Sequence, residues 1–255
     1  MGFQRVSVLA GGLEAWRAAG LKLETLSGEL PATGDRPGPT AASVDAPYMF
    51  IPSLAQRYLH EGGLPMRRRL ATLFVDIAGS TRLLAHHPPE AVLGVVQQFM
   101  RLVTEVAIAY CGDVKDFEGD GALLYFESVA EATQAAFAIR AALSCGACGV
   151  QGPVEARMSL TVGDVVIGLV GSAMRQAISV IGPSVSVGAR LLKQIPPCSI
   201  IAIGEVIEAL GGEAPALARQ FRLLDSAFEV PAADGITVAT YVSEPASSTA
   251  RNAAG

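Results

Sequence analysis

Apolar and polar positions follow two different periods along the second half of the chain, and the switches between them predict its elements. Apolar runs of strand length cover residues 70–76, 113–126 (a hairpin), 154–170 (a strand pair broken at Gly163-Asp164), the surroundings of Ile200, and 237–242. Apolar residues recur at helical spacing over 92–110, 129–143 and 184–194. This order predicts an α/β (α+β) fold with a ferredoxin-like βαββαβ core and extra C-terminal strands.

The part before residue 65 has a different pattern and predicts separate units. Residues 3–24 alternate as strand, turn and helix, whereas residues 25–46 are rich in Pro, Gly, Ser, Thr and Ala, as flexible linkers are. Further on, Phe50, Leu54, Tyr58 and Leu59 fall near one helical face. The expected order is a fragment (1–24), a linker (25–46), a short helix (47–64), the main domain (65–245) and a disordered tail (246–255). The short helix either caps the core or couples the main domain to an upstream sensor.

Composition narrows the class of protein. The 255 residues are 51% hydrophobic and carry a net charge of −5, so a sizeable core is expected. The acidic balance argues against a nucleic-acid partner, and Arg67-Arg68-Arg69 is more simply a solvated strand entry. No uninterrupted apolar run reaches the roughly 18 residues of a membrane span, and no signal peptide is recognised. We therefore expect no membrane partner and a cytoplasmic location.

The cysteines leave alternatives open. Cys145-Gly146-Ala147-Cys148 has a spacing used by zinc and redox sites, but His60, His86 and His87 are not nearby in sequence. A reduced, incidental pair in a loop is the favoured interpretation.

Two aspartates stand at the ends of strand-like runs, each beside a glycine turn. Asp76 closes the first run and precedes Ile77-Ala78-Gly79-Ser80-Thr81, and Asp120 lies in Gly119-Asp120-Gly121. Each alone is explained by helix capping or by a hairpin turn. Together, carboxylates on neighbouring strand ends favour Mg²⁺ or Mn²⁺, and two such ions can clamp a triphosphate.

These two segments, Phe74–Thr81 and Glu118–Phe126, resemble the core of the class III adenylate/guanylate cyclase homology domain. The resemblance implies that Asp76 and Asp120 bind two metal ions, with help from the backbone carbonyl of Ile77. The helix entry at Gly79, Ser80 and Thr81 would bind the triphosphate through its amides. Residues 179–191 resemble the third signature of the family and place Arg190 where it stabilises the transition state.

The same resemblance shows departures at the positions that recognise the nucleoside. Where the family has a purine-selecting lysine, this chain has Asp116, and Lys115 stands one residue earlier. A one-residue shift along a strand turns a side chain to the other face, unless a bulge restores it. Ser179 falls at the second base-selecting position, and Ser186 replaces the asparagine that orients the ribose.

The resemblance implies an adenylate cyclase, a phosphorus–oxygen lyase that converts ATP, or less readily GTP, into 3′,5′-cyclic nucleotide and pyrophosphate. It implies a homodimer, in which one subunit supplies the aspartates and the other the arginine, and a role in intracellular signalling. Residues 157–171 would supply packing and dimer surface rather than catalysis. The alternative is a weak or inactive homology domain that binds nucleotide and regulates as a dimer. No string typical of diguanylate cyclases is found.

The N-terminal residues carry a second, partial resemblance. Gly2–Val6, Leu9–Trp16 and Ala19–Leu21 resemble the last strand and helix of a rhodanese domain. The cysteine loop of that family lies upstream of this element and is absent from the sequence, so sulfur transfer is not expected. A sulfur-related accessory role is the remaining, less favoured interpretation of this end.

Overall fold

A computed structural model describes residues 54, 57, 58, 61, 63–144, 154–172, 175–231, 233 and 235–245. All of them belong to one compact unit, Pro47–Gly255. The predicted rhodanese-like fragment, the linker, the tail, and Cys145 and Cys148 lie outside the described residues.

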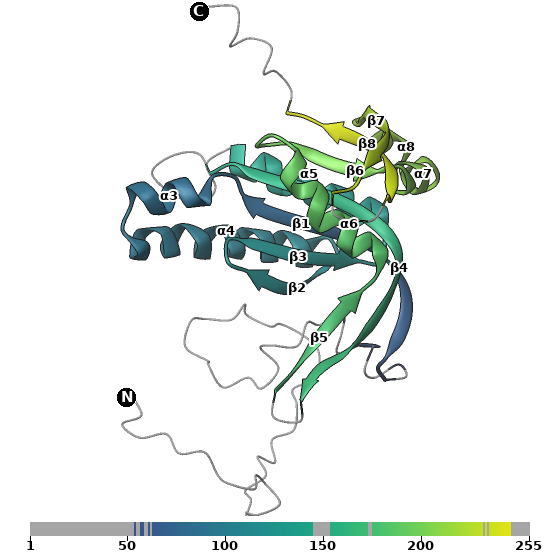
Figure 1. The fold of residues 1–255 in the computed structure, drawn as a ribbon, viewed down its shortest axis with the longest axis horizontal. Helices are drawn as coiled ribbons and strands as arrows, with labels where there is room; N and C mark the ends of the chain where they lie inside the picture. Colours follow the sequence, from purple (N-terminus) through teal and green to yellow (C-terminus); the bar gives the residue numbers. More distant parts are fainter. Residues whose placement is uncertain are drawn as a thin grey trace, which may run out of the picture. The chain divides into compact units, whose positions relative to one another are not determined.

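One sheet of eight strands organises the described part of the chain (Figure 1). The strand order is β2-β3-β1-β4-β6-β8-β7, with β5 paired to the far end of β4. All neighbours run antiparallel except β4 and β6, which are parallel. The strands are β1 (Met66–Ile77), β2 (Asp113–Glu118), β3 (Gly121–Phe126), β4 (Ala156–Ser172), β5 (Arg175–Ile181), β6 (Ile200–Ile203), β7 (Arg222–Glu229) and β8 (Thr237–Ser243).

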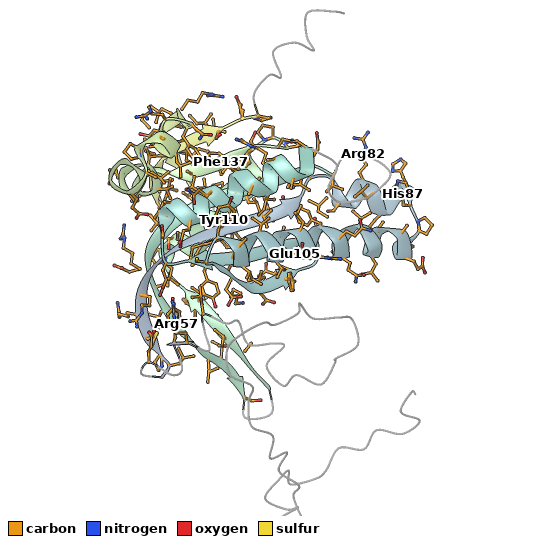
Figure 2. All side chains as sticks on the ribbon, turned by 180° about the vertical axis from the view of Figure 1, so that it is seen from behind. Arg57, Arg82, His87, Glu105, Tyr110 and Phe137 are labelled. Carbon is orange, nitrogen blue, oxygen red and sulfur yellow. The ribbon has the colours of Figure 1, made fainter. Side chains whose placement is uncertain are left out.

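Helices cover both faces of the central strands. They are α3 (Ser80–His86), α4 (Pro89–Ala109), α5 (Val129–Ser144), α6 (Pro183–Leu191) with a 3₁₀ turn η1 (Leu192–Gln194), α7 (Gly204–Glu213) and α8 (Pro215–Ala218). Seen from behind, α4 and α5 lie in front of the sheet (Figure 2), while α6 lies on the opposite face. The reason is the alternation of β1: Leu73 and Val75 join the core with α4 and α5, and Phe74 packs with Leu123 and Leu192 on the other side.

Helix α4 buries one stripe and exposes the rest. Among the described residues it is the one helix that is long and apolar enough to cross a membrane, judged by length and composition. Its buried stripe lies in the main core and consists of Val92, Val95, Phe99, Met100, Val103 and Ala107. This spacing is the helical period that the sequence predicted for 92–110.

A second, smaller core lies where the first half of β1 and strand β5 flank the same part of β4. It joins Leu54 and Tyr58, which have helical backbone, to side chains of four strands. Those side chains are Leu70, Tyr125, Val165, Ile167, Ile178 and Val180. The segment before the main domain is therefore packed against it at Leu54 and Tyr58.

The predicted α/β fold class is confirmed, and one predicted boundary is wrong. Strand β4 runs without a break through Gly163 and Asp164, which pair with Leu70 and Arg69 of β1. The turn comes only after Ser172, and β5 then returns along β4. Glycine and aspartate indicate a turn locally, but long-range pairing with β1 keeps both residues extended.

Candidate active site

Asp76 and Arg157 face each other across the pair β1–β4. Their α-carbons are register partners, and the guanidinium donates two hydrogen bonds to the carboxylate, Nε to Oδ1 at 3.2 Å and Nη2 to Oδ2 at 3.1 Å. The side chains are 18% and 25% exposed, respectively. Asp76 does not cap α3, because the N-cap is Gly79 at φ 78°. The helix-capping explanation of Asp76 is therefore wrong.

The second aspartate lies against the same strand end. Ile77 donates its backbone N–H to the carbonyl of Asp120 at 3.2 Å, and Gly121, the next residue, is the register partner of Asp76. A Cβ at Gly121 would lie 3.1 Å from the carbonyl oxygen of Val75, so glycine lets the turn approach closely. The sheet thus brings Asp76, Ile77 and Asp120 together, as the sequence predicted.

The electrostatics of this strand end suit a cation. Burial raises the pKa of the Asp76 carboxyl, Arg157 and Lys193 act to lower it, and the Asp120 carboxylate acts to raise it. Two carboxylates that repel one another in a partly buried place are relieved by a hard divalent ion. No group of three or more His, Cys, Asp or Glu that could hold a metal is found among the described residues. Metal binding here would therefore need backbone carbonyls and ligand oxygens as well.

The turn after Asp76 is shaped by Gly79. Its left-handed backbone begins α3, and its carbonyl accepts from Arg82 at 2.9 Å. On the other side, Ala78 donates its N–H to the carbonyl of Glu155 at 2.8 Å. Ser80 and Thr81 form the first residues of α3. These contacts hold the helix entry beside the end of β1.

A bulge in β2 settles the question of Lys115 and Asp116. Val114 pairs with Leu124, and Asp116 pairs with Leu123, so Lys115 is the extra residue of the strand. The Lys115 ammonium donates to Asp116 Oδ2 at 3.0 Å, which shows that both side chains lie on one face. Lys115 is only 15% exposed, and Asp116 is 52% exposed. The bulge therefore brings Lys115 and Asp116 to one face, where a regular strand would turn them to opposite faces.

Ser179 lies on the neighbouring strand β5, opposite Gly168 of β4. Its neighbours Ile178 and Val180 point into the second core, so Ser179 points away from it. Strands β2 and β5 contact each other. No hydrogen bond joins Ser179 to Lys115 within the part of the chain that the structure describes.

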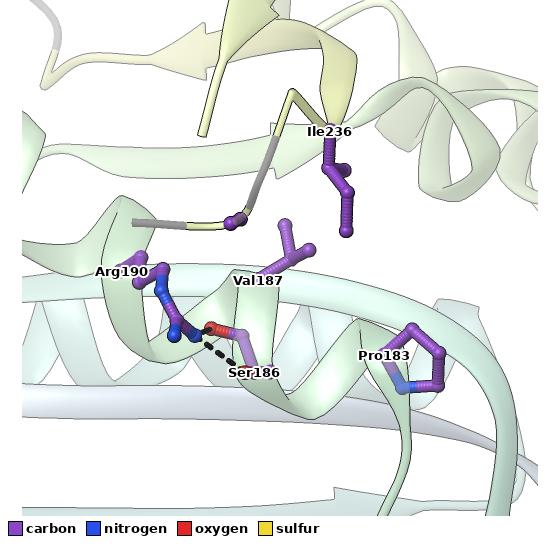
Figure 3. A pocket seen from close by; sticks show the side chains of 6 residues that line it. Pro183, Ser186, Val187, Arg190 and Ile236 are labelled. Carbon is purple, nitrogen blue, oxygen red and sulfur yellow. Dashed lines mark hydrogen bonds between the residues drawn. The ribbon is translucent and has the colours of Figure 1, made fainter. Parts of the chain in front are cut away.

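Arg190 and Ser186 come together on α6. Arg190 Nη1 donates to the carbonyl of Ser186 at 2.9 Å and also to its hydroxyl (Figure 3). In the described chain, Arg190 thus bonds to its own helix rather than to Asp76 or Asp120. Beside it lies a cavity of about 340 Å³, lined by Pro183, Ser186, Val187, Arg190, Ala233 and Ile236. Ala233 and Ile236, in the segment before β8, were not predicted from the sequence.

We call Asp76, Ile77, Asp120 and Arg157, which the structure brings together, the metal half. We call Lys115, Asp116, Ser179 and Ser186, which lie on β2, β5 and α6, the base half. Arg190 belongs to neither half. Arg157 was expected to serve packing rather than chemistry, but the structure places it on Asp76. The only sequence signal for it is a charge within an apolar strand, and its partner follows from the β1–β4 register alone.

No family model matches the chain. Among curated relatives, the uncharacterised protein Rv1318c of Mycobacterium tuberculosis is 31% identical over 157 residues, which cover 57% of this chain and 28% of that protein. The uncharacterised protein Rv1319c of the same organism is 29% identical over 147 residues, covering 56% and 28%. The chain spans less than a third of the length of these relatives.

Solved structures with the same arrangement are cyclase domains. The adenylyl cyclase CyaB of P. aeruginosa superposes with a TM-score of 0.62 at 20% identity, over 72% of this chain and 98% of that one. A bacterial light-regulated adenylyl cyclase gives 0.64 at 22%, over 75% and 58%. The guanylyl cyclase Cya2 gives 0.58 at 22%, over 73% and 97%. The described domain therefore has the fold of the class III nucleotide cyclase domains.

Proposed function

We propose that this chain is a nucleotide cyclase that converts ATP, and less readily GTP, into 3′,5′-cyclic nucleotide and pyrophosphate. The observation that supports this most is the pair of carboxylates at one strand end, in a domain with a cyclase fold. The 3′-hydroxyl oxygen forms a bond to the α-phosphorus, the bond to the bridging oxygen of the β-phosphate breaks, and the hydroxyl proton passes to solvent.

Asp76, Asp120 and the carbonyl of Ile77 would hold two Mg²⁺ or Mn²⁺ ions per site. Bound there, the ions would acidify the 3′-hydroxyl and stabilise the leaving pyrophosphate. The residues around them have separate tasks. The Arg157 guanidinium would bind phosphate oxygens, and the N–H groups of Gly79, Ser80 and Thr81 would bind the remainder of the triphosphate.

A homodimer would complete each site. Arg190 is turned toward its own helix in the single chain, so a second copy is proposed to bring its Arg190 to the phosphates held by Asp76 and Asp120. Exposed apolar side chains on the projecting β4–β5 pair, Leu169, Val170 and Ile181, favour such an association. The guanidinium would neutralise the charge that builds on the phosphates in the transition state.

The choice of ATP follows the resemblance to adenylate cyclases, and the paired side chains in the β2 bulge are compatible with it. Lys115 supplies a donor and Asp116 an acceptor, which matches the ring nitrogen and the amino group of adenine. Guanine also has partners for this pair, adjacent N–H groups for Asp116 and a carbonyl for Lys115, so GTP is the second candidate substrate. Ser179 can donate to or accept from either base. We further propose that the protein acts in the cytoplasm in intracellular signalling.

The test is direct. The purified chain is incubated with Mn²⁺ and either ATP or GTP, and the cyclic product is identified by mass spectrometry. Asp76→Ala should abolish the product, whereas Glu208→Gln, which changes an exposed acid on α7, should leave it unchanged. Product that survives in Asp76→Ala would contradict the proposed site.

A second candidate function is a nucleotide-binding, regulatory dimerisation module without turnover. The observations that favour it are the acid at Asp116 and the short hydroxyl at Ser186, where the family resemblance implies a lysine and an asparagine. A folded dimer that binds nucleotide and forms no cyclic product from ATP or GTP would decide for this alternative.

A further inference from the structure

The helical residues Leu54, Arg57, Tyr58 and Glu61, which we call the pre-domain segment, are bonded directly to the strand of the base half. The backbone N–H of Leu54 donates to Asp113 Oδ2 at 2.8 Å. The other oxygen of that carboxylate accepts from the N–H of Val114 at 2.8 Å. Asp113 is only 8% exposed, so water competes little with these bonds. One buried carboxylate thus ties the pre-domain segment to the start of β2.

The second tie reaches the end of β3. The Tyr58 side chain is fully buried, and its hydroxyl donates to Glu127 Oε1 at 3.0 Å. The guanidinium of Arg57 pairs with the other oxygen of Glu127, which directly follows β3. Burial raises the pKa of Tyr58 to about 12, and Glu127 acts in the same direction. The hydroxyl is therefore a neutral donor at ordinary pH.

Packing extends the connection to β5. Leu54 and Tyr58 share the second core with Ile178 and Val180, the two residues that flank Ser179. The pre-domain segment therefore contacts both strands that hold candidate base-binding residues, β2 through the backbone N–H of Leu54 and β5 through the shared core.

Strand β2 depends on this support because of its place in the sheet. Within the described residues it is an edge strand that pairs only with β3, and Asp113 is its one buried residue. Lys115 lies in the bulge two residues after Asp113, where the ladder is interrupted. Asp113 pairs with Tyr125 and Asp116 with Leu123, so both lie on the same face of the strand. Strand β1, which carries Asp76 one residue before its end, pairs on both sides with β3 and β4.

We propose that Asp113 and Tyr58 are positioning residues for nucleobase recognition. Docking of the pre-domain segment on the domain determines the positions of the Lys115 and Asp116 side chains. This inference rests on the proposed function and goes further by assigning control of base selection to a segment outside the main domain. Undocking loosens the base half and leaves the metal half in place.

The experiment separates the two halves with two probes on the full chain. Nucleobase selectivity is measured as the ratio of kcat/KM for ATP to kcat/KM for GTP. The affinity of the metal half for phosphate groups is measured as the inhibition constant of inorganic tripolyphosphate. Asp113→Asn and Tyr58→Ala should raise KM for ATP about tenfold and bring the ratio toward one. The inhibition constant of tripolyphosphate should change less than about twofold. Arg101→Ala, which removes an exposed pair with Glu105, is the matched control and should change neither.

Hydrogen exchange gives a readout that does not depend on turnover. In Asp113→Asn, which tests the idea even where Tyr58→Ala fails to fold, amides of 113–118 should exchange faster while those of 72–77 keep their rates. The inference would be overturned if the affinities for ATP and for tripolyphosphate fell equally. It would also be overturned if neither the ATP-to-GTP ratio of kcat/KM nor the amide exchange of residues 113–118 changed.

The failure of the proposed function has a different signature. If the wild-type chain makes no cyclic product, calorimetric binding of ATP and GTP with Mn²⁺ replaces kcat/KM. The inference then stands if Asp113→Asn narrows the difference between the two affinities, and it fails if the difference is unchanged.

Discussion

The metal half and the base half of the candidate site are built in different ways. Asp76 and Asp120 stand at the ends of central strands, and the register of β1 with β3 and β4 determines their separation and their contact with Arg157. Lys115 and Asp116 lie on an edge strand at a bulge, and Ser186 lies on a helix that packs over the sheet. A strand that is paired on both sides therefore fixes the positions of its site residues. An edge strand needs contacts from other elements to do the same.

The departures from the cyclase signatures that the sequence resembles fall on one side of this contrast. Both aspartates and Arg190 are present, and the departures at Asp116 and Ser186 fall in the base half. A change on an edge strand or on an exposed helix face disturbs few neighbours, whereas a change at Asp76 would leave Arg157 partly buried without its partner.

The largest effect is expected at Arg190, which lies outside both halves. Arg190→Ala should lower kcat at least about 100-fold, because a transition-state charge loses its partner. Mixing Arg190→Ala with inactive Asp76→Ala subunits should restore up to about a quarter of the wild-type rate, since half of the dimers then contain one intact site. The measurement is turnover at increasing total protein. Restoration that fails under conditions where mixed dimers are demonstrated would show that Arg190 and Asp76 act within one chain.

A large effect on stability is expected at the contact between α6 and β1. In Gly188→Ala, the new Cβ would lie 2.9 Å from Phe74 Cδ2 and 3.2 Å from Thr161 Oγ1. We expect a loss of about 1–3 kcal/mol in the free energy of unfolding, measured by urea denaturation. Gly94→Ala, in open space on α4, is the control and should stabilise by up to about 1 kcal/mol. An unchanged Gly188→Ala protein would mean that α6 is not packed tightly on Phe74.

A moderate effect is expected from a change of charge in the base half alone. Asp116→Lys should lower kcat/KM about tenfold for ATP and further for GTP, because the acceptor for the adenine amino group, and for the two adjacent N–H groups of guanine, becomes a donor. The measurement is product formation with each nucleotide, and Glu208→Lys on α7 controls for net charge. Equal changes with both nucleotides would show that Asp116 does not face the base.

The smallest effect is the pH dependence of Tyr58. Burial raises the pKa of Tyr58 in the folded protein to about 12, above the ordinary tyrosine value of 10.0. Its contribution to stability is therefore complete below pH 10 and is lost as pH rises through about 12. Tyr58→Phe should flatten the fall of Tm across this window, measured by circular dichroism. If Tm of Tyr58→Phe falls as steeply with pH as that of the wild type, groups other than Tyr58 cause the loss of stability.

Much of the fold and half of the site could be predicted from local pattern. The spacing of apolar residues and the turn residues predicted most helices and strands. The positions of Asp76 and Asp120 beside their glycines predicted that these two residues would lie close together. The predicted break at Gly163-Asp164 was wrong because pairing with β1, a contact between residues more than 90 positions apart in sequence, decides that backbone. Local preference is a weak term beside such pairing.

The amino-acid sequence by itself therefore determined the class of fold and the order of most elements, and it predicted two acids at neighbouring strand ends, since these depend mainly on patterns within a few residues. The tertiary structure alone decided that Arg157 faces Asp76, that a bulge turns Lys115 to the side of Asp116, and that Asp113 and Tyr58 connect an outside segment to the base half. Those outcomes depend on strand register and on packing between distant residues, because a shift of one position along a strand reverses every side chain.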